Sequence, residues 1–201
     1  MSALVTVGEL GVAIGLIIVA ILIYKKGRSK GLLWTNYFSF GVFILALAHI
    51  FKALPFVPLS YPVDAPARYT GLILILYAML KEVEHPKTDL LTGLGILNGL
   101  AYNEGVLLYN ILGKSFLALL LLIPQYMFLV IGPLVGSIIL FNIYKSSKDI
   151  LALIFALGFI VYAVANAVMV TAIYFVQNLL ALYYIMMGIT LLIGIIIGLI
   201  V

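Results

Sequence analysis

Long apolar runs separated by short charged turns constrain this chain more than any other feature of its sequence. A helix needs roughly 20 mostly apolar residues to cross the hydrocarbon core of a bilayer. Runs of about this length occupy residues 4–24, 32–53, 68–83, 90–112, 116–144, 150–175 and 178–201. Lipid offers no water to unpaired backbone groups, so such runs fold as helices. We therefore predict an all-α integral membrane protein with seven transmembrane helices.

Composition supports the membrane class and narrows the chemistry. Only 9% of the residues are charged and 66% are hydrophobic, whereas a soluble domain carries roughly a quarter charged residues. The formal net charge of +4 is read first as a topology signal and not as a nucleic-acid footprint. The chain has no cysteine, which excludes disulfides, thiolate metal sites and iron–sulfur ligation.

Three of the runs carry features that leave their structure open. Pro55 ends the second helix, and the proline-rich stretch after it predicts a connection that lasts until Arg68. The run at 90–112 contains three asparagines and Glu104, so a re-entrant or interfacial segment is the alternative to a spanning helix. The fifth run carries Pro124 and Pro133, which predict a kink.

The distribution of basic residues predicts the orientation. With seven spans, eight of the eleven basic residues fall in the connections on one side, and positive charge favours the cytoplasm. We therefore predict the N-terminus outside and the C-terminus at the cytoplasmic face of the cell membrane. The densest positive cluster, which anchors this orientation, consists of Lys25, Lys26, Arg28 and Lys30.

An internal duplication is a second hypothesis about the organisation. The Tyr-Lys pair at 24–25 matches that at 144–145, and a gapped alignment then places His49 opposite Asn166. Chance sharing of alanine and glycine between apolar helices is the alternative. If the repeat is real, the single polytopic domain consists of two parallel halves, 1–89 and 116–201, joined by the helix at 90–112.

This three-plus-one-plus-three plan resembles the SWEET sugar transporters in outline. Pro124-Gln125 matches the PQ dipeptide of that wider group. The first helix has no counterpart to the dipeptide and no other part of the chain matches, so membership of the family is not inferred.

Polar side chains within apolar runs are costly and mark candidate sites. The predicted orientation places several of them toward the extracytoplasmic side, which predicts an outer polar pocket for a lipid, a quinone or a small ligand. We expect one of its carboxylates to pair with His49, Lys52 or Arg68. The alternative is that these groups are simply hydrated among the headgroups. The predicted pocket residues are Glu9, His49, Glu104, Gln125 and Asn166.

No cofactor, metal or catalytic constellation is predicted. A haem bound by His49 needs an axial partner, and the other histidine, His85, lies in a turn predicted at the opposite face. A metal site of Glu9, His49 and Glu104 has no spacing signature. No serine, histidine and carboxylate occur at hydrolase-like spacing.

Three functions fit this sequence. The first is a non-catalytic subunit of a larger membrane complex, for instance in electron transfer, whose polar pocket binds lipid, quinone or a small ligand. The alternatives are a small-solute transporter of the three-plus-one-plus-three type and a seven-helix sensor without its own output domain. The expected partners are membrane lipids and other membrane subunits, not nucleic acid. The expected location is the cell membrane, which the chain crosses several times.

Overall fold

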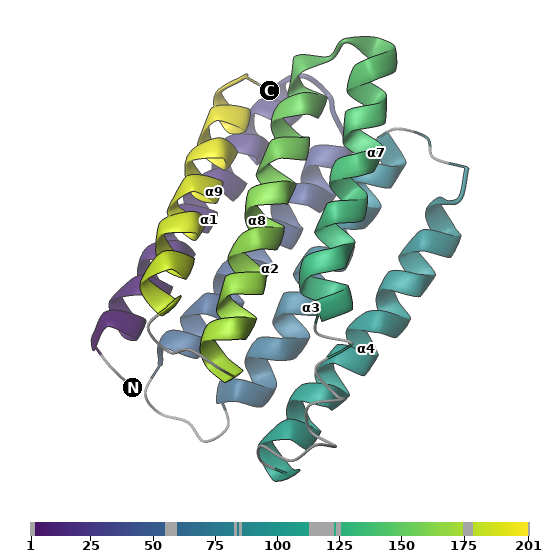
Figure 1. Cartoon of the computed structure of the whole chain (residues 1–201). Coiled ribbons are helices and arrows are strands. Elements are labelled where there is room, and N and C mark those ends of the chain that lie inside the picture. Colours follow the sequence, from purple (N-terminus) through teal and green to yellow (C-terminus); the bar gives the residue numbers. More distant parts are fainter. Residues whose placement is uncertain are drawn as a thin grey trace. The chain divides into compact units, whose positions relative to one another are not determined.

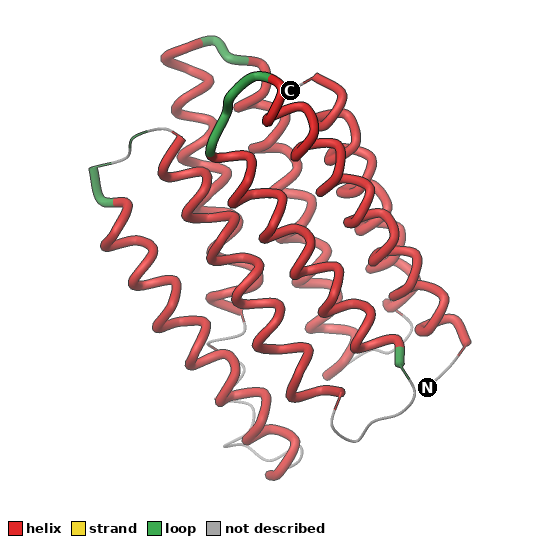
Figure 2. Tube along the Cα trace, turned by 180° about the vertical axis from the view of Figure 1, so that it is seen from behind, coloured by secondary structure: helices red, strands yellow, loops and turns green. Residues whose placement is uncertain are grey.

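The computed structural model describes residues 3–54, 60–82, 84, 86–112, 123, 126–174 and 179–200. Throughout this part of the chain the regular structure is helical, without a strand (Figure 2). Contacts divide the chain into two compact units, Met1–Gln125 and Tyr126–Val201. The all-helical class predicted from the sequence is thus confirmed for the described residues.

The first unit is a series of antiparallel helices in which each packs on the next (Figure 1). At one end of the first pair Glu9 contacts His49, and at the other end Gly27 lies against Thr35, so the two helices run in opposite directions. Helices joined by short turns are expected to lie side by side in this way. The helices are α1 (Ala3–Ser29), α2 (Trp34–Ala53), α3 (Ser60–Glu82) and α4 (Thr88–Leu112).

Two glycines set the distance between α2 and α3. A Cβ atom added to Gly41 would lie 2.7 Å from the carbonyl oxygen of Gly71, and one added to Gly71 would lie 2.7 Å from that of Gly41. The backbones therefore approach more closely than side chains would permit. Tyr37 and Tyr77 meet edge to face near one end of the pair, with ring centroids 5.3 Å apart. This register places the end of α2 beside the beginning of α3.

The start of α3 corrects the sequence prediction. The helix begins at Ser60 and not at Arg68, and it includes Pro62, Asp64 and Pro66. Proline is tolerated in a first helical turn, because the backbone N–H groups there have no partner within the helix. Only Pro66 lies beyond that turn. Because proline has no N–H, the helix lacks one backbone hydrogen bond there. Residues 60–67, interpreted as part of a broken connection, are therefore helical.

Other helix boundaries follow local chemistry. α1 continues to Ser29, five residues past the predicted end at Tyr24, and its last turns carry cations, which favour the negative end of the helix dipole. α2 ends at Ala53 as predicted, since Leu54 adopts an extended conformation ahead of Pro55. α4 is one continuous helix.

The second unit consists of a π-helical segment and three α-helices. α7 packs on α8, α8 packs on α9, and the π-helical segment contacts both α7 and α8. Lys148 closes the turn after α7 in a left-handed conformation with φ 58°, and Asp149 caps the next helix through a 2.9 Å bond from the Leu151 N–H. The elements are η1 (Met127–Ile131), α7 (Gly132–Ser147), α8 (Ile150–Tyr174) and α9 (Leu180–Ile200).

The π-helical segment lies where the sequence predicts a kink. The N–H of Gly132 donates to the Met127 carbonyl oxygen, five residues back, and Pro133 follows directly. Proline lacks an N–H and its ring crowds the carbonyl four residues earlier, so a wider turn accommodates it. Such register changes are among the causes of helix bending. Pro124 lies outside the described residues.

Within the described residues, five helical stretches are long and apolar enough to cross a membrane, which indicates that the protein inserts into one. Neither α3 nor α4 is among the five, and α3 carries charged residues near both of its ends. The spans are Val5–Ser29, Trp34–Ala53, Met127–Ser147, Ile150–Ala172 and Leu180–Ile200.

Candidate functional site

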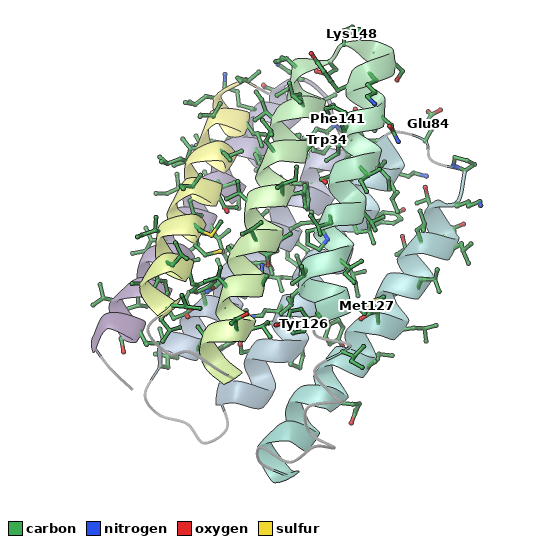
Figure 3. The ribbon with its side chains drawn as sticks, in the orientation of Figure 1. Trp34, Glu84, Tyr126, Met127, Phe141 and Lys148 are labelled. Carbon is green, nitrogen blue, oxygen red and sulfur yellow. The ribbon has the colours of Figure 1, made fainter. Side chains whose placement is uncertain are left out.

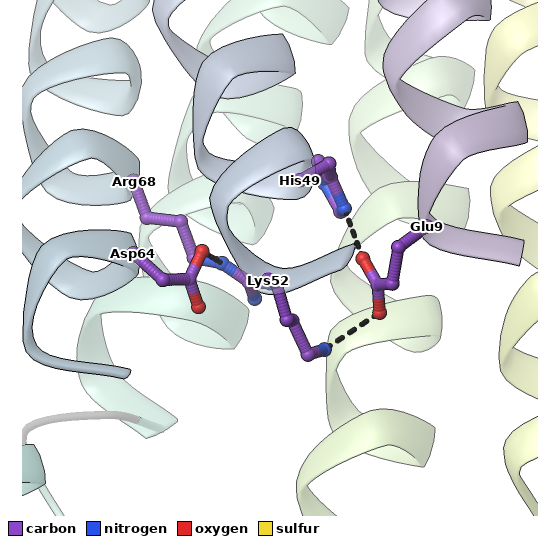
Figure 4. A network of polar contacts seen from close by, with 5 residues as sticks. All are labelled: Glu9, His49, Lys52, Asp64 and Arg68. Atoms are coloured by element: carbon purple, nitrogen blue, oxygen red, sulfur yellow. Dashed lines mark hydrogen bonds and ion pairs between the residues drawn. The ribbon is translucent and has the colours of Figure 1, made fainter. Parts of the chain in front are cut away.

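The candidate site is built around Glu9, near the beginning of α1. Its side chain is completely buried, and both carboxylate oxygens are engaged (Figure 4). Oε2 lies 2.6 Å from Nδ1 of His49, and Oε1 lies 2.7 Å from Nζ of Lys52. Both partners come from the last turns of α2, three residues apart and thus on one face of the helix. Glu9 therefore connects two of the apolar helices.

The short bond to Glu9 determines which nitrogen of the His49 ring is protonated. An ionised carboxylate only accepts hydrogen bonds, so Nδ1 must carry the proton that it donates to Oε2. In the neutral ring this leaves Nε2 as the acceptor. A proton that binds Nε2 would create an imidazolium that Glu9 already faces. The pair can therefore gain or lose one proton without rebuilding the contact.

A second ion pair belongs to α3. Nε of Arg68 donates to Oδ1 of Asp64 at 3.0 Å, and both side chains are nearly buried. The two residues lie four apart, the spacing that brings side chains together on a helix. The charge of Arg68 also acts on Glu9 and His49, so we consider the two pairs together. We call them the charged cluster: Glu9, His49, Lys52, Asp64 and Arg68.

The charged cluster is balanced. It contains two carboxylates and two permanent cations, so it is neutral when His49 is neutral. Burial makes this balance important, since removing one partner of a buried ion pair typically costs about 3–5 kcal/mol. Among Glu9, His49 and Lys52, the lysine side chain is the most exposed, at 17%. Water therefore reaches the cluster most readily from its side.

Packing of the α1–α2 turn brings Glu9 to His49. Gly31 turns the chain with φ 70°, and the Leu32 N–H donates to the Gly27 carbonyl oxygen at 2.9 Å. Gly27 has no side chain, and the space where its Cβ would be is filled by Thr35. Because the turn is so tight, the beginning of α1 lies beside the end of α2.

Two residues of the predicted pocket meet within the first unit. Glu9 and His49 meet, and Glu9 is the carboxylate that pairs with Lys52. Glu104 is exposed on α4, with no ion pair to the described residues. Asn166 belongs to the second unit, where its Nδ2 donates to the Tyr162 carbonyl oxygen at 2.8 Å. Gln125 lies outside the described residues.

Asp64 was missed as a site residue. The sequence interpretation assigned it to a connection, so its spacing of four from Arg68 carried no weight. Treated as helix, the same spacing would have predicted the ion pair.

The described residues contain no group of three histidines, cysteines or carboxylates placed to hold a metal ion. Comparison with protein-family models, with curated proteins and with solved structures gives no match. Function is therefore inferred from the charged cluster and from the helices that position it.

Proposed function

We propose that the protein crosses the cell membrane seven times, with its N-terminus outside and its C-terminus in the cytoplasm. The lengths of α3 and α4 support two spans beyond the five apolar ones. Their 23 and 25 residues correspond to about 34 and 37 Å, against a hydrocarbon core of about 30 Å. α3 also packs antiparallel on α2, so a membrane that contains α2 contains α3 as well.

Labelling of single introduced cysteines tests this topology, because the chain has none of its own. Glu84, in the turn between α3 and α4 (Figure 3), separates the alternatives. With seven spans, cysteines at Ser29 and Glu84 react from the cytoplasmic side. If only the five apolar helices span, a cysteine at Glu84 reacts from outside while one at Ser29 still reacts from the cytoplasm.

We further propose that the protein is a proton-coupled transporter of a small organic anion. The observation that carries this proposal is the Glu9 carboxylate, buried in a spanning helix and shared between His49 and Lys52. Ionisable groups at such positions commonly mark proton relays and substrate paths. The π-helical segment in the second unit adds support, since such segments are frequent at functional sites.

Charge balance indicates the class of solute. A proton bound at Nε2 of His49 gives the charged cluster one positive charge in excess. Glu9 is then shared between an imidazolium and the Lys52 ammonium, which leaves Lys52 able to meet a carboxylate from outside the protein. One proton and one monoanion together restore neutrality, and a buried site favours neutral states. The proton leaves Nε2 when the anion leaves.

Flux into proteoliposomes tests the transporter. Uptake of radiolabelled acetate, lactate and pyruvate is measured with an inward proton gradient and without one. We expect gradient-driven uptake of at least one of these monocarboxylates, with loss of that uptake in Glu9→Gln and Lys52→Met. Glu84→Gln is the matched control, because Glu84 is exposed at the other end of the first unit. Absence of gradient-driven uptake in the folded wild type, or equal loss in the control, contradicts the proposal.

The membrane-subunit function remains the second candidate, on a different observation. Leu90, Leu94 and Leu97 form an exposed row on α4, which has contacts to α3 in the first unit. A partner helix would cover such a row. Purification in mild detergent tests it: a partner of fixed stoichiometry favours the subunit, and a lone monomer contradicts it.

A further inference from the structure

The turn between α1 and α2 is the most cationic surface in the first unit. Lys25, Lys26, Arg28 and Lys30 are all exposed, and we call them the basic turn. The sequence holds no acidic residue between Glu9 and Asp64, so no carboxylate belongs to either helix near the basic turn. Residues 10–63 therefore add no negative charge to the basic turn.

Local hydrogen bonds order the basic turn. Nη1 of Arg28 donates to the Tyr24 hydroxyl at 3.3 Å, and Oγ of Ser29 donates to the Lys26 carbonyl oxygen at 2.7 Å. Gly31 closes the turn with no heavy atom within 4 Å of where its Cβ would be, so the outer side is open. The cations are thus presented on a defined backbone.

Apolar and aromatic side chains surround these charges. Leu33 in the turn is 75% exposed, and Tyr24 and Tyr37 on the adjoining helices are 41% and 46% exposed. Trp34 begins α2 at the same end (Figure 3). Aromatic residues beside cations are typical of the membrane–water boundary, where the rings lie at headgroup level. The surface therefore matches a ligand with an anionic head and an apolar tail.

The nearest comparable surface differs in charge. The α3–α4 turn, at the same end of the first unit, carries both signs: Lys81, Glu82, Glu84, Lys87 and Asp89. All five are exposed. The charges of the α3–α4 turn largely cancel. An anion is therefore attracted more strongly to the basic turn than to the α3–α4 turn.

We propose that the basic turn binds the headgroups of anionic phospholipids in preference to zwitterionic ones. Clusters of Lys and Arg directly beside a spanning helix attract such lipids. The exposed Leu33 and tyrosines favour a lipid over a free phosphate, because they give the acyl chains an apolar surface. This site is separate from the charged cluster, so it stands whether or not the protein is a transporter.

Trp34 provides the test, because it is the single tryptophan of the chain and begins the helix that follows the basic turn. The full-length protein is placed in nanodiscs with a small, varied fraction of brominated phosphatidylglycerol or brominated phosphatidylcholine. Bromine quenches tryptophan fluorescence at short range, so quenching reports which lipid is bound near Trp34. We expect brominated phosphatidylglycerol to quench at a much lower fraction than brominated phosphatidylcholine.

Matched variants assign the preference to the basic turn. Attraction of about fivefold for each cation predicts that Lys26→Gln with Arg28→Gln lowers the preference by about 25-fold. The control is Lys145→Gln with Lys148→Gln, which removes two cations from the second unit, where they lie over the rings of Phe141 and Tyr144. The control should keep the preference. The charge-retaining variant Lys26→Arg with Arg28→Lys should keep it too, and added salt should weaken it in the wild type.

The proposal is overturned by any of the following results. Equal quenching by the two lipids would show that the surface does not select anionic headgroups. Displacement of brominated phosphatidylglycerol by millimolar inorganic phosphate at constant ionic strength would assign the site to free phosphate. An equal loss of preference in the control would assign the effect to net charge. Two further tests apply if the glutamine variant does not fold. The proposal is overturned if the folded charge-retaining variant loses the preference. It is also overturned if salt has no effect on the wild type.

Discussion

Replacing Lys52 by methionine should destabilise the protein more than replacing its partner Glu9 by glutamine. Methionine keeps the length and apolar stem of lysine but removes the ammonium 2.7 Å from Oε1 of Glu9. The carboxylate is completely buried and cannot turn to water. Of the two contacts to α2, it would keep only the one to His49. We expect a loss of about 3–5 kcal/mol in the free energy of unfolding, the usual cost of leaving one ion of a buried pair.

The reciprocal change should cost less. In Glu9→Gln the amide oxygen still accepts a hydrogen bond from Nδ1 of His49. The Lys52 side chain is 17% exposed and lies at the end of α2, so its ammonium can reach water along its flexible stem. We expect a loss of about 1.5–3 kcal/mol, the scale of one net hydrogen bond to a charged group. The double variant should recover about 2 kcal/mol relative to Lys52→Met alone, because no buried charge is left without a partner.

Unfolding in mixed micelles with increasing SDS measures these differences. The signal is the fluorescence of Trp34, which meets Phe38 edge to face at 5.9 Å between ring centroids and so reports the packing of α2. The expected order is refuted if Glu9→Gln costs as much as Lys52→Met. It is also refuted if the double variant is less stable than both single variants, because the contact would then not carry a buried charge.

Further substitutions test the packing with matched controls. Gly41→Ala should destabilise the protein by about 1–3 kcal/mol, because the added methyl group overpacks against the α3 backbone. Gly11→Ala, where the methyl group enters open space, should stabilise the protein by up to about 1 kcal/mol. Equal effects of the two substitutions in SDS unfolding would contradict the close approach of α2 and α3. Lys148→Gly should stabilise the protein by about 1 kcal/mol, because glycine adopts the left-handed backbone conformation without the strain of a side chain. Lys145→Gly, within α7, should destabilise the protein by about the same amount. Melting temperatures in the reverse order would show that the turn is not left-handed. Asp64→Asn should cost about 3 kcal/mol because it removes the carboxylate that contacts the buried guanidinium of Arg68, and an unchanged melting temperature would place the pair in water.

The helical class and most of the helix positions could be predicted from the order of apolar and polar residues. Apolar runs of spanning length have few alternatives to helix in lipid. The prediction therefore agrees closely with the end of α2 at Ala53, the end of α4 at Leu112 and the start of α8 at Ile150. The start of α3 was placed eight residues late, because prolines were read as breaks without allowing for a helical first turn. The register change before Pro133 was anticipated as a kink, but its π-helical form depends on how neighbouring helices hold the backbone.

The identity of the polar residues that meet could not be predicted, because it depends on how the helices pack. Sequence reasoning offered two carboxylates for His49, and nothing in a one-dimensional pattern distinguishes Glu9 from Glu104. The tight turn at Gly31 folds α2 back along α1, and this approach carries Glu9 to His49 and Lys52. The contact of Gly41 with Gly71 draws α3 against α2. Hydropathy reports how much of a helix prefers lipid, whereas the partner of a buried charge depends on the rotation and depth of each helix, which packing alone sets.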